Sequence, residues 1–187
     1  MNKPYVPHKI ALIAIFAALT ASGALIRIPI PPVPITLQSF FVIMAGLILG
    51  PKAGALSQVI YLLVGILGLP VFSGGGGLSY VLRPSFGYLI GFILAPLAVG
   101  SFMENREYKP ANIFIASCLG MLAIYMVGVP YLAIYMRYIL NKPDAIILAI
   151  KAGLLVFLPG DVLKIIILAI IVPKLNLFYI WRRPYSK

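Results

Sequence analysis

The sequence predicts an all-α integral membrane protein: a single domain over residues 1–187, built as a bundle of six transmembrane helices with both termini in the cytoplasm. Of the 187 residues, 62% are hydrophobic and only 10% are charged, and the mean hydropathy is +1.06. Such a chain has too little polar surface to cover a water-soluble globule. Because the apolar segments recur along the whole length, a cleaved N-terminal signal does not account for them.

Six apolar segments are long enough, or nearly so, to cross a bilayer as helices, which takes about 20 residues. They cover residues 9–27, 36–49, 53–67, 86–103, 111–139 and 145–172. The second and third are short and flank the stretch GPKAG, in which Pro51 and Gly54 indicate a tight turn. We expect these two segments to form a hairpin of tilted or partly re-entrant helices.

The distribution of Lys and Arg predicts the orientation in the membrane, because cytoplasmic loops are enriched in them. With a cytoplasmic N-terminus, nine basic residues lie inside and four lie outside. The outer four are Arg27, Arg83, Arg137 and Lys142. Both termini are therefore expected in the cytoplasm, which agrees with an even number of spans.

Two loops of unusual composition fall on the outer side in this orientation. The first contains Pro29, Pro31, Pro32 and Pro34 in an extended apolar segment, a composition that favours a stiff lid or rim. The second contains four consecutive glycines, Gly74 to Gly77. Glycine lets a main chain approach a ligand closely, so this run is either a binding floor, a mobile gate or a flexible connector.

The last segment carries an acid and a base, Asp161 and Lys164, in a run of otherwise apolar residues. At a spacing of i, i+3 they share a helix face, and an ion pair between them offsets part of the cost of each charge in the membrane. The pair either fixes helix packing or binds a solute. Ionisable residues inside spans usually line cavities, which favours binding. Pro159 and Gly160 loosen the helix just before the pair.

Composition and motifs exclude several classes of function. One cysteine and one histidine cannot form a disulfide, a multi-cysteine metal site or a histidine cluster. The net charge of +11 comes from basic residues scattered between apolar runs, which argues against nucleic-acid binding. The sequence also lacks the motifs of metalloproteases, serine hydrolases and P-loop ATPases, so neither an enzyme nor a resident cofactor is expected.

Four motifs follow one another along the chain, and they are PxPxTLQ, LGPKAGALSQVIYLLVGILGLPVFSGGGG, RPSFGYLIGF and PGDVLK. Taken in this order, they resemble the BioY family of biotin-specific substrate-binding subunits (S-components) of energy-coupling factor (ECF) transporters. The resemblance implies a six-helix S-component fold in a prokaryotic plasma membrane, capturing biotin on the outer side. It also implies a partner complex, made of a transmembrane coupling protein and two cytoplasmic ATPases.

The same resemblance suggests roles for individual residues. Asp161 would accept a hydrogen bond from a biotin ureido N–H, while Lys164 would donate to the ureido carbonyl or to the valerate carboxylate. Some family members have an asparagine in the glycine-rich loop and an arginine after the Pro-Ser-x-Gly-Tyr block. Glycine and Leu89 stand there in this chain, and Arg83 is the expected substitute. The further candidates for the substrate site are Gln38, Tyr88, Tyr80, Gly75 and Gly76.

The first segment carries small residues four apart on one face, Ala14 with Ala18 and Ala17 with Ala21. Small residues at this spacing let helices approach closely in lipid. They serve either packing inside the bundle or, as the resemblance implies, docking of Ala14 and Ala18 on the coupling protein.

A second class of function stays open at this point, a small channel or a self-sufficient secondary carrier for another small polar solute. Six unequal segments without evident inverted repeats argue against a carrier with two related halves. Biotin binding by the isolated chain, with transport only after an ATPase module is added, would separate the two classes.

Overall fold

The computed structural model describes residues 6–175, so the predicted cytoplasmic ends of the chain lie outside the described residues. Helices dominate this part of the chain, as predicted. The elements are α1 (Val6–Leu25), β1 (Arg27–Ile28), β2 (Ile35–Thr36), α2 (Gln38–Ile66), η1 (Leu78–Leu82), α3 (Phe86–Met103), α4 (Pro110–Tyr138), α5 (Ala145–Ile150), η2 (Lys151–Leu155), α6 (Leu158–Ile171) and η3 (Val172–Leu175).

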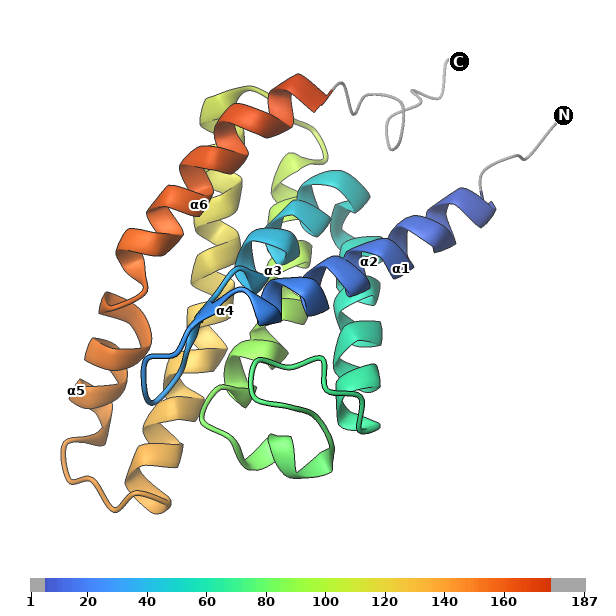
Figure 1. The fold of residues 1–187 in the computed structure, drawn as a ribbon. Coiled ribbons are helices and arrows are strands. Elements are labelled where there is room, and N and C mark those ends of the chain that lie inside the picture. The colour runs from blue at the N-terminus through green and yellow to red at the C-terminus, as the bar shows by residue number, and fades with distance from the viewer. Residues whose placement is uncertain (1–5, 176–187) are drawn as a thin grey trace, which may run out of the picture.

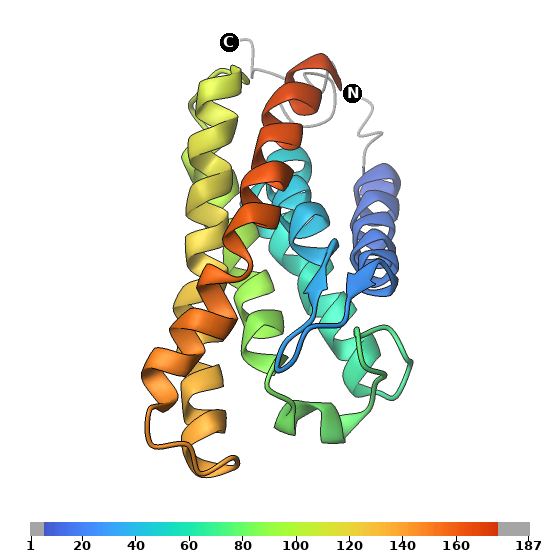
Figure 2. The same ribbon diagram turned by 60° about the vertical axis from the view of Figure 1, so that its left-hand side comes forward.

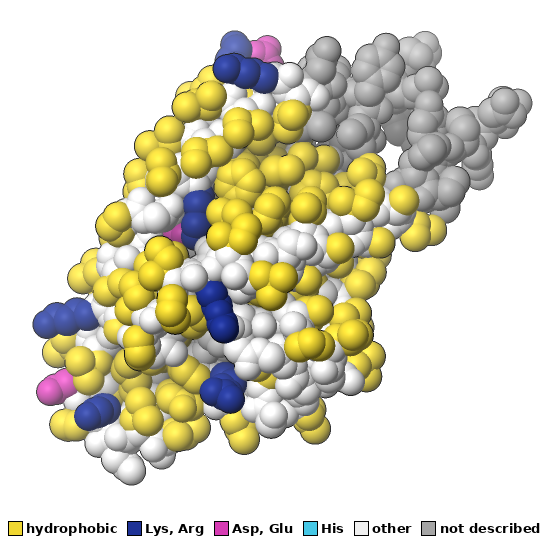
Figure 3. Space-filling model, viewed as in Figure 1, with side chains coloured by type: hydrophobic (Ala, Val, Ile, Leu, Met, Phe, Trp, Pro, Cys, Tyr) yellow, Lys and Arg dark blue, Asp and Glu magenta, His cyan; other side chains and the backbone are white. Residues whose placement is uncertain are grey.

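Within residues 6–175, four helical stretches are long and apolar enough to cross a membrane. They are Gln38–Ile66, Phe86–Met103, Pro110–Tyr138 and Ala145–Leu175, and Lys9–Leu25 forms a shorter apolar helix. Hydrophobic side chains cover most of the face shown in Figure 3, and the Lys and Arg side chains on it are few and scattered. The chain is therefore a multi-pass membrane protein.

Helix α2 contains the predicted turn, which lies at Gly50. The φ of Gly50 is 76° and its ψ is −176°, a conformation open to glycine, and Pro51 disfavours a helical residue before it. The chain reverses there, so the predicted segments 36–49 and 53–67 are two arms of α2 (Figure 1). Gly54 stays helical. A Cβ on Gly54 would lie 2.8 Å from Pro96 Cβ, so this glycine permits close packing against α3.

The predicted span 145–172 is helical but interrupted. Helix α5 continues into the π-helical turn η2, and α6 begins at Leu158. Pro159 lies in the first turn of α6, where its missing N–H leaves no hydrogen bond unmade. The irregular turn therefore lies at Lys151–Leu155, before Pro159 and Gly160, and both of these residues belong to the first turn of α6 together with Asp161.

Helix α3 packs between α2 and α4, while α1 packs on α2 and the α5–α6 stretch packs on α4 (Figures 1 and 2). A Cβ on Gly46 would lie 2.8 Å from Pro96 Cα, and one on Gly91 would lie 2.8 Å from Ile124 Cα. Small residues at these crossings let the helix backbones approach closely, the main source of helix association in lipid.

A short antiparallel hairpin joins α1 to α2, with Arg27 paired to Thr36 and Ile28 to Ile35. The proline-rich segment forms its loop. The backbone N–H of Leu37 donates to the carbonyls of Gly23 and Ile26, each at 3.1 Å, which fixes the base of the hairpin to the end of α1. The hairpin runs along the bundle between α1 and α6 (Figure 2).

Candidate binding site

A cavity of about 60 Å³ lies under the hairpin, between helices α2, α3, α4 and α6. Its wall is mostly apolar, with polar groups at a few positions. The lining residues are Val33, Pro34, Ile35, Thr36, Gln38, Ser39, Ser73, Ser85, Tyr88, Leu89, Phe92, Met121, Ile124, Tyr125, Phe157, Asp161 and Lys164.

The acid and the base predicted in the last span both line this cavity. Lys164 Nζ lies 2.9 Å from Asp161 Oδ1, and the two side chains are 11% and 9% exposed. The i, i+3 spacing in the first turns of α6 brings them together, as predicted. A charge pair so buried is stable only when its remaining donors and acceptors also find partners.

Those partners come from two other parts of the chain. The Tyr125 hydroxyl donates to Asp161 Oδ2, while Lys164 Nζ donates to the Thr36 carbonyl at 2.8 Å and to Ser39 Oγ at 3.0 Å. Both carboxylate oxygens and all three ammonium hydrogens are thus engaged. We did not predict Tyr125, Thr36 and Ser39 as partners of the pair, because nothing in the sequence links an uncharged residue to a charged one 36 or more positions away.

Gln38 also lines the cavity, as predicted, and it links the cavity to the loop after α2. Its amide Nε2 donates to the Tyr61 hydroxyl, which donates to the Val71 carbonyl at 3.2 Å. Its Oε1 accepts from Thr36 Oγ1 at 3.0 Å. Gln38 therefore orients both the hairpin and the glycine-containing loop around the cavity.

Tyr88 forms part of the wall, together with Tyr125 and Phe157. The rings of Tyr125 and Phe157 lie edge-on to that of Tyr88, with centroids 6.5 Å and 6.0 Å away. The Tyr88 hydroxyl donates to the Gly153 carbonyl at 2.8 Å. Gly153 lies in the π-helical turn, so the irregular backbone of that turn offers this acceptor to α3.

Tyr80 lies behind the wall rather than in it. Its hydroxyl is 3.2 Å from Ser73 Oγ and 3.1 Å from Ser85 Oγ, and both serines line the cavity. The hydroxyls of Tyr80, Ser73 and Ser85 have three hydrogens in all, and the two hydrogen bonds among them use two. One hydroxyl hydrogen therefore remains to donate to a further acceptor. Tyr80 thus positions two polar groups of the site.

Arg83, Gly75 and Gly76 do not line the cavity. Arg83 follows the 3₁₀ turn η1, and its side chain is exposed. Gly75 has a φ of +121° and pairs with Phe72 in a β-bridge. Gly76 packs so tightly on the backbone of Leu69 that a Cβ would overlap the Leu69 carbonyl. Gly76 is therefore packed against the end of α2 and the turn that follows it.

The two alanines predicted for partner docking, Ala14 and Ala18, are exposed, while Ala17 is 8% exposed and belongs to the core. The face that carries Ala14 and Ala18 thus points away from the bundle. Packing inside the bundle is done by Ala17 and the neighbouring Ile13 and Phe16.

The site can bind a small solute that carries both donors and acceptors. Asp161 offers an acceptor, Lys164 a donor, and Ser73, Ser85 and Gln38 offer neutral polar groups. The aromatic and aliphatic wall suits an apolar ring or chain between them. Residues 6–175 contain no group of three or more His, Cys, Asp or Glu side chains placed to bind a metal ion.

Comparison with known proteins decides the family. The family model described as BioY family matches residues 1–180. The chain belongs to the BioY family. Among BioY relatives, it is 49% identical over 137 residues to "Probable biotin transporter BioY" of Lysinibacillus sphaericus, covering 73% of this chain and 70% of that protein.

Two further relatives match a larger share of this chain. It is 42% identical over 169 residues to "Probable biotin transporter BioY" of Pyrococcus horikoshii, which covers 90% of this chain and 96% of the relative. It is 38% identical over 163 residues to "Biotin transporter BioY" of Thermotoga maritima, and the match covers 87% of this chain and 92% of that relative. These relatives bear the names of transporters rather than enzymes.

The BioY fold also matches a solved structure, described as the crystal structure at 2.1 Å of the S-component for biotin from an ECF-type ABC transporter. The TM-score is 0.79, the sequence identity is 31%, and the match covers 94% of each chain. The S-component fold of this chain is therefore established by family and by architecture.

Proposed function

We propose that this chain binds biotin in the cavity under the hairpin and serves as the substrate-binding subunit of an ECF transporter. The observation that carries the proposal is the buried pair of Asp161 and Lys164 in the wall of that cavity. Relatives named as biotin transporters, and a similar structure described as an S-component for biotin, support the choice of solute.

The chemistry of biotin suits the pair. Its ureido ring has two N–H donors and one C=O acceptor, its second ring is an apolar thioether ring, and its valerate chain ends in a carboxylate. Asp161 accepts from a ureido N–H, and Lys164 donates to an oxygen of the ligand, the ureido carbonyl or the carboxylate. Tyr88, Phe157 and the aliphatic wall contact the thioether ring and the methylenes.

Binding requires the hairpin to move. Ligand cavities for small organic molecules usually measure about 300–1,000 Å³, whereas this cavity measures about 60 Å³. Val33 and Ile35 of the hairpin line this cavity together with the pair. Outward movement of the hairpin admits biotin and enlarges the cavity, and closure of the hairpin over the bound ligand then excludes water from the polar contacts.

The proposal includes an orientation and a partner. With six spans, counting the two arms of α2 separately, both termini lie on one side of the membrane. The distribution of Lys and Arg favours the cytoplasm for that side, so the hairpin lies toward the outer face, where biotin is captured. Energy for uptake comes from a coupling protein and two cytoplasmic ATPases in a prokaryotic plasma membrane. The exposed face with Ala14 and Ala18 supports docking on the coupling protein through close helix contact.

Titration of the purified chain with biotin tests the proposal. We expect tight, saturable binding measured by calorimetry. Lipoate, which shares a carboxylate on an alkyl chain but has no ureido ring, should compete poorly. Vesicles containing the chain alone should accumulate little biotin until the coupling protein and ATPases are added with ATP. Failure to bind biotin, with the chain folded, would overturn the proposal.

A further inference from the structure

A second concave site lies on the lipid-facing side of the bundle, between the C-terminal half of α4 and helix α5. Its volume is about 870 Å³. It is separate from the biotin cavity and shares no lining residue with it. The lining residues are Val129, Pro130, Ala133, Ile134, Arg137, Tyr138, Pro143, Asp144, Ala145, Ile146, Ile147 and Ile150. We call this site the α4–α5 groove.

The length of the α4–α5 groove matches one leaflet of a bilayer. The groove follows α4 from Val129 to Tyr138, which at 1.5 Å per residue is about 13 Å. One leaflet of a bilayer with a hydrocarbon core of about 30 Å measures about 15 Å. Because both helices belong to membrane-spanning stretches, an acyl chain of a lipid can lie along the groove.

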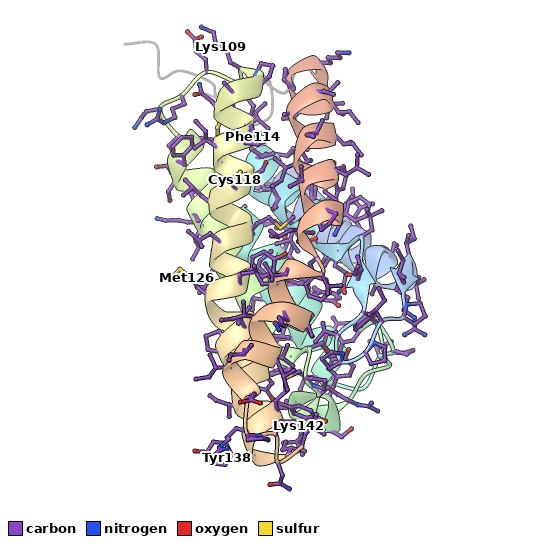
Figure 4. The ribbon with its side chains drawn as sticks, turned by 90° about the vertical axis from the view of Figure 1, so that its left-hand side faces the viewer. Lys109, Phe114, Cys118, Met126, Tyr138 and Lys142 are labelled. Atoms are coloured by element: carbon purple, nitrogen blue, oxygen red, sulfur yellow. The ribbon has the colours of Figure 1, made fainter. Side chains whose placement is uncertain are left out.

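The polar groups of the groove gather at one end. Arg137 and Tyr138 belong to the last turn of α4, and Asp144 directly precedes α5. Tyr138 lies at the end of the bundle opposite Lys109 (Figure 4). Tyrosine and arginine at the end of a span mark the level of the lipid headgroups. A lipid whose chain lies in the groove therefore presents its headgroup to Arg137 and Asp144.

The side chains of Arg137 and Asp144 form no hydrogen bond or ion pair within residues 6–175. Asp144 precedes α5 but makes no side-chain capping hydrogen bond. In the part of the chain that the structure describes, no ion pair joins Arg137 to Asp144. The groove thus presents one cation and one anion at the headgroup level, without an ion pair between them.

We propose that the α4–α5 groove is a binding site for a zwitterionic phospholipid with a primary ammonium group, of the phosphatidylethanolamine class. Arg137 donates to the phosphate, and Asp144 accepts from the ammonium, which has three N–H donors. A phosphatidylcholine headgroup lacks these donors, and a phosphatidylglycerol headgroup lacks the cation. Asp144 therefore sets the preference among headgroups, and Arg137 contributes to binding of all three.

Native mass spectrometry of the delipidated, full-length chain tests this site, with phosphatidylethanolamine, phosphatidylcholine and phosphatidylglycerol of identical acyl chains added one at a time. We expect the parent chain to retain phosphatidylethanolamine about fivefold better than the other two, the factor expected from one added charge contact at the interface. Asp144→Asn should abolish this preference. Arg137→Gln should weaken all three lipids.

Two further variants sharpen the test. Lys142→Gln changes a basic residue at the same end of the bundle that does not line the groove, and it should leave retention unchanged. Ala133→Phe fills the apolar part and should lower retention of every lipid. Equal retention of the three headgroups by the parent, or an unchanged preference in Asp144→Asn, would show ordinary boundary lipid and overturn the proposal.

Discussion

Lys164 and Thr36 join the last helix to the hairpin that covers the cavity, with 2.8 Å between the ammonium Nζ and the Thr36 carbonyl oxygen. The other two hydrogens of this ammonium go to Asp161 and Ser39. A ligand oxygen that accepts from Lys164 must therefore replace one of the three partners. If it replaces Ser39, the bond from Lys164 to Thr36 remains and holds the hairpin over the ligand.

Asp161→Asn and Lys164→Ala should each weaken biotin binding by about 2–5 kcal/mol, the range for removing one partner of a buried, hydrogen-bonded charge pair. Isothermal titration calorimetry on the purified variants measures this loss. Lys151→Ala is the control, because Lys151 belongs to the same span but its side chain is exposed. Wild-type affinity in both pair variants would mean that the pair only fixes helix packing.

Tyr125→Phe should lower both biotin affinity and thermal stability, because it leaves one oxygen of the buried Asp161 without a donor. An unsatisfied buried group costs about 1–3 kcal/mol. Tyr138→Phe, on the same helix but 77% exposed, should change neither quantity. If Tyr125→Phe behaves like Tyr138→Phe, then Asp161 does not depend on the tyrosine hydroxyl.

The parts of this fold that follow from local sequence were predictable. Chain regions of about 20 apolar residues predict helices wherever lipid is the solvent. The stretch GPKAG predicts a turn, although the structure places it at Gly50 rather than between Pro51 and Gly54. The contact between Asp161 and Lys164 follows from helix periodicity alone. These features depend on residues a few positions apart.

Long-range contacts were not predictable in the same way. Tyr125 lies 36 positions before Asp161, and the backbone carbonyl of Thr36 carries no side-chain signal. Arg83 is the expected substitute for the arginine of other family members, but its side chain is exposed after η1. Tyr80 is a predicted substrate-site residue, yet its hydroxyl acts through Ser73 and Ser85. Whether such a residue reaches the cavity depends on how helices and loops from distant parts of the chain pack together.

Gly76→Ala should destabilise the loop after α2, whereas Gly74→Ala should be tolerated. A Cβ on Gly76 would overlap the Leu69 carbonyl, which is backbone and cannot turn aside. A Cβ on Gly74 would meet only Tyr80 atoms at 3.5 Å and 3.7 Å, in ordinary contact. We expect a loss of about 1–3 kcal/mol for Gly76→Ala, measured by thermal unfolding in detergent. Equal stability of the two variants would contradict this packing.

Replacement of both Ala14 and Ala18 by Trp should reduce co-purification with the coupling protein and ATP-driven uptake together, because bulky side chains block close helix approach. Biotin affinity of the isolated chain should stay near normal, since both alanines are exposed. Ala17→Trp provides the contrast. Ala17 is buried, so this change should damage folding itself. If the Ala14 and Ala18 variant lost biotin affinity but still assembled with the coupling protein, the α1 face that carries these alanines would pack inside the bundle instead of docking.

Biotin should change the distance between the hairpin and the glycine-containing loop. Spin labels at Ile30 and Leu78, which are 37% and 74% exposed, report on the two elements without filling the cavity. The exposed Cys118 is first replaced by Ala so that labelling stays specific. Because the hairpin must open to admit biotin and then close above it, pulsed electron paramagnetic resonance should show a narrower, shorter distance distribution with biotin than without it.

A control pair at Leu122 and Ile166, exposed positions on α4 and α6, should give the same distribution with and without biotin, because these helices form the rigid part of the bundle. Ser39→Ala removes one partner of Lys164 but keeps the bond to Thr36. This variant should therefore retain the narrowing at the Ile30 and Leu78 pair. Unchanged distributions at that pair, alongside proven tight binding, would reject movement of the hairpin as the route by which biotin reaches Asp161 and Lys164.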